Sequence, residues 1–279
     1  MTRVAVVTDS TAYLPAVQAE AASVTVVPVQ VVVGGATHDE TEVSSETIAE
    51  ALREWRPIST SRPSPSAFVE AYQRLALGGV DEIVSVHLSG AMSATVESAQ
   101  LAAKEVTIPV RVVDSRSIGM GLGFPVLAAA QAAASGADGS RVEAIARERS
   151  ASASVLFYVD TLEYLRRGGR IGKAAALLGS ALSVKPLLHL VDGNVAPLEK
   201  VRTTSKALSR LEEITLDRVG EGAADVAVQH LANPDKAHSL AAHIQERAGG
   251  AVAVTVGEVG AVVGAHVGPG MIAVAVCPR

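Results

Sequence analysis

"DEIVSVHLSGAMSAT", residues 81–95, is a run of apolar and β-branched residues that gives way to Ser-Gly and then to small residues. This order predicts a buried strand, a sharp turn and a helix from about residue 91 to 104. The turn carries Ser89 and Gly90 and no Lys or Arg. Free N–H groups and the dipole at a helix start favour an anion, and glycine lets a ligand approach the backbone. A serine at such a place also commonly serves only as a helix cap.

The first half of the chain alternates predicted strands with predicted helices. Apolar strand patterns occur at residues 3–10, 24–33 and 110–115, and helical patterns at 45–55 and from Pro65 to Gly78. A long Ala-rich helical stretch follows and runs to about residue 152. Such alternation indicates a doubly wound, mainly parallel sheet. We therefore predict an N-terminal α/β domain over residues 1–152.

The pattern changes after residue 152. "VLFYVD" at 155–160 predicts a strand, and "KPLLHLVDGNVAPLEKV" at 185–201 predicts two strands joined at Asp192-Gly193, a strong hairpin signal. A hairpin among helices indicates a mixed or antiparallel sheet. We therefore predict a second α/β domain, with helices on such a sheet, over residues 153–279.

Bulk composition narrows the function classes. The 279 residues carry a net charge of −5, which argues against nucleic acid as the main partner, and aromatic residues make up only 3%. Cys277 is the sole cysteine, so an intrachain disulfide is excluded. No histidines or cysteines stand at metal-site spacing, and no signal peptide or run of ~20 apolar residues is present. We expect a soluble cytoplasmic protein without a metal.

Two further loops contain candidate binding residues. "TSRPS", residues 60–64, offers hydroxyls in a chain stiffened by prolines, and "GAHVGPG", residues 264–270, sets His266 in a predicted glycine-rich loop before the last strand. Rigid loops of this kind commonly join binding sites. The alternatives are a turn with a helix cap for the first loop and a structural histidine in a tight turn for the second.

"RRGGRIGK", residues 166–173, is a basic cluster. It places Arg166, Arg167, Arg170 and Lys173 among three glycines. Such a cluster suits docking to an acidic partner or to anionic lipid. The alternative is an ordinary solvated surface.

Two functions compete for these residues. Ser89, Asp114 and His266 occur in the chain order of an α/β-hydrolase triad, but His87 and Ala91 replace the glycines of a nucleophile elbow. The other function is capture of an organic acid, because hydroxyls, amides and one histidine suit a carboxylate. An interior poor in aromatic residues suits an alkyl tail.

The full set of motifs resembles the DegV family of fatty-acid-binding proteins. The matching pieces, in chain order, are "VTDSTAYLP", "TSRPSPSAF", "HLSGAMSAT", "VDSRSIGMGLGF", "YVDTLEYLRRGGRIGKAAALLG", "KPLLHLVDGNV" and "HVGPG". Each piece alone is weak evidence for the family, but all seven in this order across the chain are specific for it. The resemblance implies two α/β domains and a long-chain fatty acid as ligand. It places carboxylate-binding residues at Ser89, Gly90, His266 and either Thr60 or Ser61.

The resemblance further implies a carrier subunit that has no resident cofactor and is not itself an enzyme. A separate ATP-dependent fatty acid kinase would phosphorylate the bound acid, and the acyl phosphate would pass to phospholipid synthesis. The basic cluster at residues 166–173 would then suit docking to that kinase or transient contact with anionic membrane. The chain departs from the family pattern at Arg62, where the family commonly has Gln, and at Ala91-Met92, where it has Thr-Tyr. The preferred acyl chain therefore does not follow from the resemblance.

Overall fold

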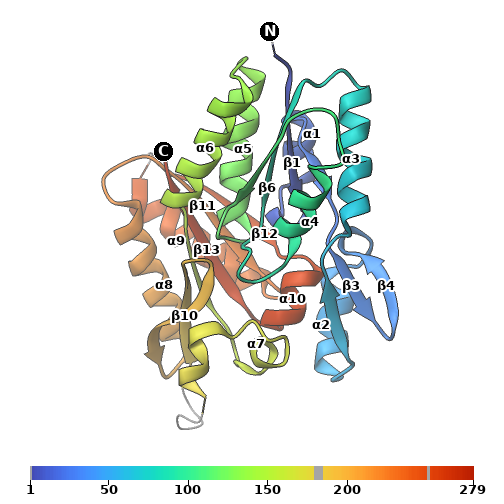
Figure 1. The fold of residues 1–279 in the computed structure, drawn as a ribbon. Helices are drawn as coiled ribbons and strands as arrows, with labels where there is room; N and C mark the ends of the chain where they lie inside the picture. Colours follow the sequence, from blue (N-terminus) through green and yellow to red (C-terminus); the bar gives the residue numbers. More distant parts are fainter. Residues whose placement is uncertain (1, 179–184, 250–251) are drawn as a thin grey trace. The chain divides into compact units, whose positions relative to one another are not determined.

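The computed structural model describes residues 2–178, 185–249 and 252–279, and the chain folds into two compact units (Figure 1). Unit 1 comprises Met1–Gln30 and Ser61–Ala153, and unit 2 comprises Val31–Thr60 and Ser154–Arg279. The chain passes between the units three times, and the last passage, after Ala153, lies one residue from the boundary that we predicted after residue 152. Residues 31–60, which we placed in the first domain, pack within unit 2 instead.

Unit 1 contains a four-stranded sheet in the order β2-β1-β6-β7. Its strands are β1 (Val4–Asp9), β2 (Thr25–Val27), β6 (Glu82–His87) and β7 (Val110–Asp114). All three pairings are parallel, as we predicted. The strands therefore end at the same edge of the sheet, which is where ligands bind in open α/β sheets. Asp9, His87 and Asp114 are the last residues of three of these strands.

Helices cover both faces of this sheet, as alternation of buried side chains along each strand requires. Val6 and Val84 pack with α5 (Met120–Ala134) and α6 (Gly139–Ser152). Val7 and Ile83, on the opposite face, pack with α3 (Pro65–Leu77) and α4 (Thr95–Ala102). Figure 1 shows these two helix pairs on the two sides of β1 and β6. A short helix, α1 (Ala16–Ala21), and a 3-10 turn, η1 (Ser10–Ala12), follow β1.

Two helices of unit 1 differ from the sequence prediction. The Ala-rich stretch forms two helices, because Gly136 takes a φ of +86° and Asp138 caps α6 by accepting the N–H of Arg141 at 2.8 Å. Helix α4 begins at Thr95, later than the predicted residue 91. The intervening residues form a tight turn, in which the N–H groups of Met92 and Ser93 donate to the Ser89 carbonyl.

Unit 2 contains a six-stranded mixed sheet in the order β10-β9-β8-β13-β11-β12. Only the β11–β12 pairing in it is parallel, and the four others are antiparallel. The Asp192-Gly193 hairpin is confirmed, with φ values of 50° and 76° at its two residues. The strands are β8 (Ser154–Tyr158), β9 (Lys185–Val191), β10 (Asn194–Val201), β11 (Ala224–His230), β12 (Val252–Glu258) and β13 (Ile272–Pro278).

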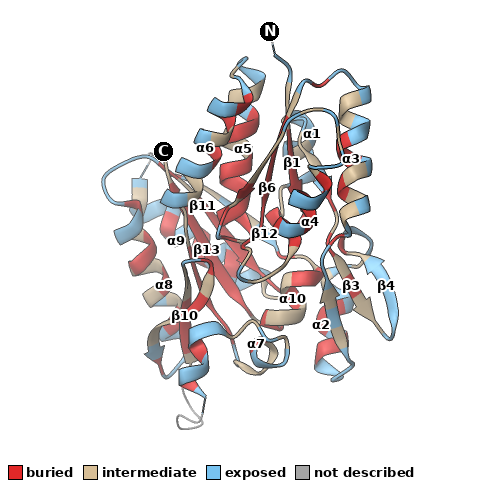
Figure 2. Cartoon of the chain, viewed as in Figure 1, coloured by how far each residue is buried: buried red, intermediate tan, exposed pale blue. Residues whose placement is uncertain are grey.

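The main core of unit 2 lies between this sheet and two helices, α8 (Thr204–Val219) and α9 (Pro234–Ala248). Leu211 and Ile244 from these helices pack with Val226 and Val274 from the strands. In Figure 2, β13 is mostly buried while α8 carries exposed residues on its outer side. No helix in the described ranges is long and apolar enough to cross a membrane.

Residues 31–60 join unit 2 through a short helix, α10 (Ala261–Val267). Glu40 accepts the N–H of Val262 at 2.8 Å, and Ser45 donates to the Val259 carbonyl at 2.9 Å. This segment forms β3 (Gln30–Val33), β4 (Ala36–Asp39), β5 (Ile58–Ser61), the turn η2 (Glu40–Glu42) and helix α2 (Ser45–Arg53), with the strands in the order β4-β3-β5. These contacts span more than 200 residues of sequence, so no local pattern could reveal them.

Candidate functional site

His266 lies in the last turn of α10, where we expected an irregular loop. The segment is helical because Glu40 satisfies an N–H of its first turn and Gly268 donates to the Gly264 carbonyl at its end. Gly268 and Gly270 then take φ values of +77° and +88°, which turn the chain toward β13. The glycines of "HVGPG" thus end a helix and fix the position of His266.

Thr60 and His266 come together in unit 2. Thr60 lies on β5, and its Oγ1 is 2.8 Å from His266 Nε2. The neighbouring Ser61 is exposed, and its hydroxyl makes only a long, 3.4 Å contact with the Arg62 carbonyl. Successive side chains of a strand point to opposite faces. Of the two hydroxyls that the sequence left open, Thr60 is therefore the one that contacts the predicted histidine.

The imidazole of His266 is held in a buried, neutral state. Burial, together with the nearby charge of Arg170, lowers the pKa of His266 from 6.5 to about 4. Its Nδ1 has no hydrogen-bond partner in the part of the chain that the structure describes. Gly168 packs directly against this edge of the ring, and a Cβ at that position would overlap it. Because Gly168 covers Nδ1, the ring can act on a ligand only through Nε2 and the Thr60 hydroxyl bonded to it.

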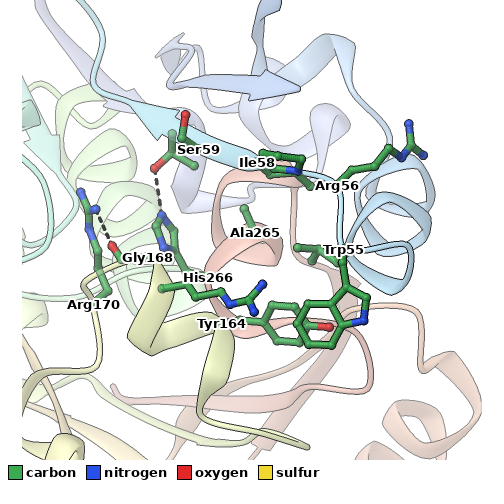
Figure 3. A pocket seen from close by; sticks show the side chains of 13 residues that line it. Trp55, Arg56, Ile58, Ser59, Tyr164, Gly168, Arg170, Ala265 and His266 are labelled. Atoms are coloured by element: carbon green, nitrogen blue, oxygen red, sulfur yellow. Dashed lines mark hydrogen bonds between the residues drawn. The ribbon is translucent and has the colours of Figure 1, made fainter. Parts of the chain in front are cut away.

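A pocket of about 440 Å³ lies beside this pair, and its lining comes entirely from unit 2 (Figure 3). Thr60, His266 and Arg170 form one part of its wall. Trp55 and Tyr164 form another, with their rings stacked at 6.1 Å, and the Arg167 guanidinium lies 4.5 Å from the Trp55 ring. The remaining lining residues are Leu52, Arg56, Pro57, Ile58, Ser59, Gly168 and Ala265. The wall near His266 therefore combines hydroxyl, imidazole and cationic groups, which suits an anionic head group.

The predicted Ser89 turn lies in unit 1. Ser89 is fully buried, and its Oγ accepts the N–H of Ala91 at 3.2 Å. The N–H of Gly90 donates to Asp114 Oδ1 at 3.2 Å, so this amide already has a carboxylate acceptor within unit 1. Because α4 starts only at Thr95, its dipole does not begin at Gly90 as we expected. The hydroxyl of Ser89 remains the chief candidate of this turn.

The arrangement does not match the hydrolase alternative. In a catalytic triad, an aspartate accepts from the histidine that activates the serine. Asp114 instead accepts the backbone N–H groups of Gly90 and Arg116, at 3.2 and 2.8 Å. His266 uses Nε2 for Thr60 and leaves Nδ1 without a partner in the described ranges. We therefore do not propose hydrolysis.

The four cations of the basic cluster have different surroundings. Arg166 and Arg167, in helix α7 (Glu163–Arg167), both bind Glu163 at 2.7 Å, and these bonds lower the pKa of that carboxyl to about 2. Lys173 is exposed in the turn η3 (Gly172–Leu177). Arg170 lines the pocket and donates to the Gly168 carbonyl at 2.7 Å. Arg170 thus belongs to the pocket that contains His266, a location that its sequence spacing did not indicate.

Several residues of the site escaped the sequence analysis. Trp55 appeared only as part of an amphipathic helix, yet it takes a φ of +57°, an outlier for a bulky residue, and lines the pocket. Tyr164 and Gly168 lie near the basic cluster and carried no separate signal. Among the described residues, no group of three His, Cys, Asp or Glu side chains is placed to hold a metal ion.

Comparison with known proteins gives a consistent family match. Residues 3–279 match a family model described as "Uncharacterised protein, DegV family". A DegV domain-containing protein of Streptomyces coelicolor is 53% identical over 277 residues, which cover 99% of each chain. A DegV domain-containing protein of Mycobacterium tuberculosis is 38% identical over 277 residues, covering 98% of this chain and 96% of the other.

Solved structures show the same fold. A fatty-acid-binding DegV family protein from Thermus thermophilus has a TM-score of 0.93 at 34% identity, and the match covers all of both chains. A DegV from Bacillus subtilis, also described as a fatty-acid-binding protein, has a TM-score of 0.92 at 31% identity over the same full coverage.

Proposed function

The chain belongs to the DegV family, and we propose that it binds a long-chain fatty acid through the Thr60–His266 pair and presents the carboxylate to a separate kinase. The observation that carries the proposal is the half-buried hydroxyl–imidazole pair at the wall of a 440 Å³ pocket. Fatty acid binding by the Thermus and Bacillus relatives supports the choice of ligand.

The pair has the donors that a carboxylate needs. With its proton on Nε2, His266 donates to Thr60 Oγ1, and the Thr60 hydroxyl then donates its own proton to the ligand. Because the ring stays neutral, as its lowered pKa requires, it adds no full charge to the head group. Arg170 supplies the cation of this wall.

Ser89 and Gly90 of unit 1 stay separate candidates for ligand binding, and Ser89→Ala tests them on their own. The acyl chain provides affinity through burial, at about 0.8 kcal/mol for each CH₂ group. In this proposal the protein is a carrier and not an enzyme alone. It holds no cofactor of its own, and the kinase brings ATP and metal. Arg166, Arg167 and Lys173 would contact the kinase or anionic membrane.

Mass spectrometry of lipid extracted from denatured, freshly purified protein tests the proposal. We expect a long-chain fatty acid in near-stoichiometric amount. Protein that is reproducibly empty and also takes up no added palmitate or oleate would contradict fatty acid binding. Kinase partnership is tested separately, by acyl phosphate formation from the loaded protein, ATP and a fatty acid kinase.

A further inference from the structure

Four fully buried polar side chains in unit 1 form a hydrogen-bonded network that is separate from the pocket beside Thr60 and His266. The Tyr72 hydroxyl on α3 donates to Ser85 Oγ at 2.8 Å, and Ser85 Oγ lies 2.7 Å from His87 Nε2 on β6. His87 Nδ1 in turn lies 3.1 Å from Asp9 Oδ2 at the end of β1. Tyr72, Ser85, His87 and Asp9 all have a relative exposure of 0%.

Each side chain of this network donates a hydrogen bond to the next, from Tyr72 through Ser85 and His87 to Asp9. Because Ser85 accepts the Tyr72 proton, its own proton is directed to His87 Nε2. Nε2 is then an acceptor, and Nδ1 carries the proton that bonds Asp9. The tautomer of His87 is assigned from its two hydrogen-bond partners. The His87 ring is further fixed by Phe68, which meets it edge-on at 5.0 Å.

The network ends on the backbone of the Ser89 turn. Asp9 Oδ2 also accepts the N–H of Leu88 at 2.9 Å, while Asp9 Oδ1 accepts the N–H of Thr11 at 3.1 Å. Asp9 therefore connects the end of β1 to the peptide immediately before Ser89. The orientation of the Asp9 carboxylate is fixed in turn by the His87 Nδ1–H.

We propose that Tyr72, Ser85, His87 and Asp9 form a relay that positions Ser89 as a ligand-binding residue of unit 1. Ser85, His87 and Asp9 have the connectivity of a Ser-His-Asp triad, but Ser85 is fully buried and its hydroxyl already binds Tyr72, so it is no nucleophile. The four are positioning residues that act through the Leu88 peptide. This inference rests on the proposed function, because Ser89 must contact the ligand.

Two isosteric changes at His87 separate the ends of the relay. Asparagine places a donor near the position of Nδ1 and keeps the Asp9 contact, whereas glutamine places its amide near Nε2 and loses it. We expect His87→Gln to weaken palmitate binding roughly tenfold and His87→Asn to change it by less than about threefold, the scale of coupling between contacting residues. In a Ser89→Ala background, His87→Gln should cause no further loss.

Thr8→Val is the matched control. Thr8 is also fully buried on β1, and its hydroxyl donates to the Val86 carbonyl of β6 at 2.8 Å, outside the relay. Thr8→Val should lower the melting temperature and leave palmitate affinity unchanged. If destabilisation of the β1–β6 pair were the cause of weaker binding, Thr8→Val would lose palmitate affinity as His87→Gln does. If neither His87 variant folds, Tyr72→Phe replaces them as the test, because it removes only one hydroxyl of the relay. We then expect palmitate affinity to fall by a few-fold.

Three results would overturn the relay. The first is wild-type palmitate affinity in His87→Gln, or in Tyr72→Phe if the His87 variants do not fold. The second is equal palmitate affinity in His87→Asn and His87→Gln, and the third is an affinity loss in the His87→Gln, Ser89→Ala double variant equal to the sum of the two single losses in free energy. Wild-type affinity in Ser89→Ala would also overturn it, since nothing would remain to be positioned. Failure of the unmodified protein to bind palmitate is a different result, because it refutes the proposed function itself.

Discussion

Gly168→Ala is expected to disable the Thr60–His266 pair without removing a functional group. Gly168 has a φ of −73°, so alanine fits its backbone. The obstacle is the imidazole of His266, because an added Cβ would lie 2.7 Å from its Cε1 and closer still to Nδ1. Either the ring or the Gly168 backbone must move, and both movements disturb the 2.8 Å contact to Thr60.

Gly168→Ala should lower both the thermal stability of the protein and its affinity for palmitate. Overpacking of a close-packed site costs about 1–3 kcal/mol, and each kcal/mol lowers Tm by about 2–4 °C in a unit of this size. Loss of a hydrogen bond to the charged carboxylate costs about 1.5–3 kcal/mol, or roughly 10- to 150-fold in affinity.

Calorimetric titration of delipidated protein with palmitate, together with a thermal melt, measures both quantities. Gly222→Ala is the matched control, because a Cβ there meets no atom within 4 Å and both quantities should stay unchanged. Wild-type palmitate affinity in Gly168→Ala, with a Tm like that of the control, would refute the placement of His266 and its role.

The remaining predictions concern the second hydroxyl, the basic cluster and pH. Ser89→Ala should weaken palmitate binding roughly 10- to 150-fold, measured by the same titration, and an unchanged affinity would remove Ser89 from the site. The double variant Arg166→Glu, Lys173→Glu should keep palmitate affinity but form acyl phosphate more slowly than the wild type at low salt. Arg147→Glu in unit 1 is the control and should leave this rate unchanged. Equal rates for the double variant and the wild type would reject a docking role. Burial, and then Arg170, lowers the pKa of His266 from 6.5 to about 4, so the unfolded chain protonates first as the pH falls. Denaturant titrations should therefore show stability lost between pH 6.5 and about 4, by up to ~3 kcal/mol, and His266→Gln should lack this component; equal pH slopes would contradict a neutral buried ring.

The strand patterns and the Asp192-Gly193 turn predicted most of the fold because they are local. Alternation of buried residues places Val6 and Val7 on opposite faces of β1, and such patterns survive in the folded chain. The helix at α10 was missed because its stability comes from Glu40, more than 200 residues away in sequence. The same long-range contacts placed residues 31–60 in unit 2, which no feature of their own composition indicates.

Some of the residues that line the pocket had been singled out in the sequence. Thr60 and His266 were named from two separate loops, and the structure pairs them at 2.8 Å. Arg170 was grouped with its sequence neighbours because charge runs carry no information on which side chain turns inward. Trp55 was assigned to a helix face because its spacing fits one, whereas its left-handed backbone at the end of α2 directs the ring to Tyr164. A left-handed backbone conformation is uncommon for tryptophan, so the sequence did not predict one at Trp55.

The most direct test of the account is the NMR resonance of palmitate labelled with carbon-13 at its carboxyl carbon, bound to the protein. We predict one bound resonance that shifts in Thr60→Val, which removes the hydroxyl beside His266, and that keeps its position in Thr215→Val, which removes a buried hydroxyl of α8. A bound resonance that Thr60→Val leaves unmoved, or the absence of any bound resonance, would contradict the claim that this pair holds the head group.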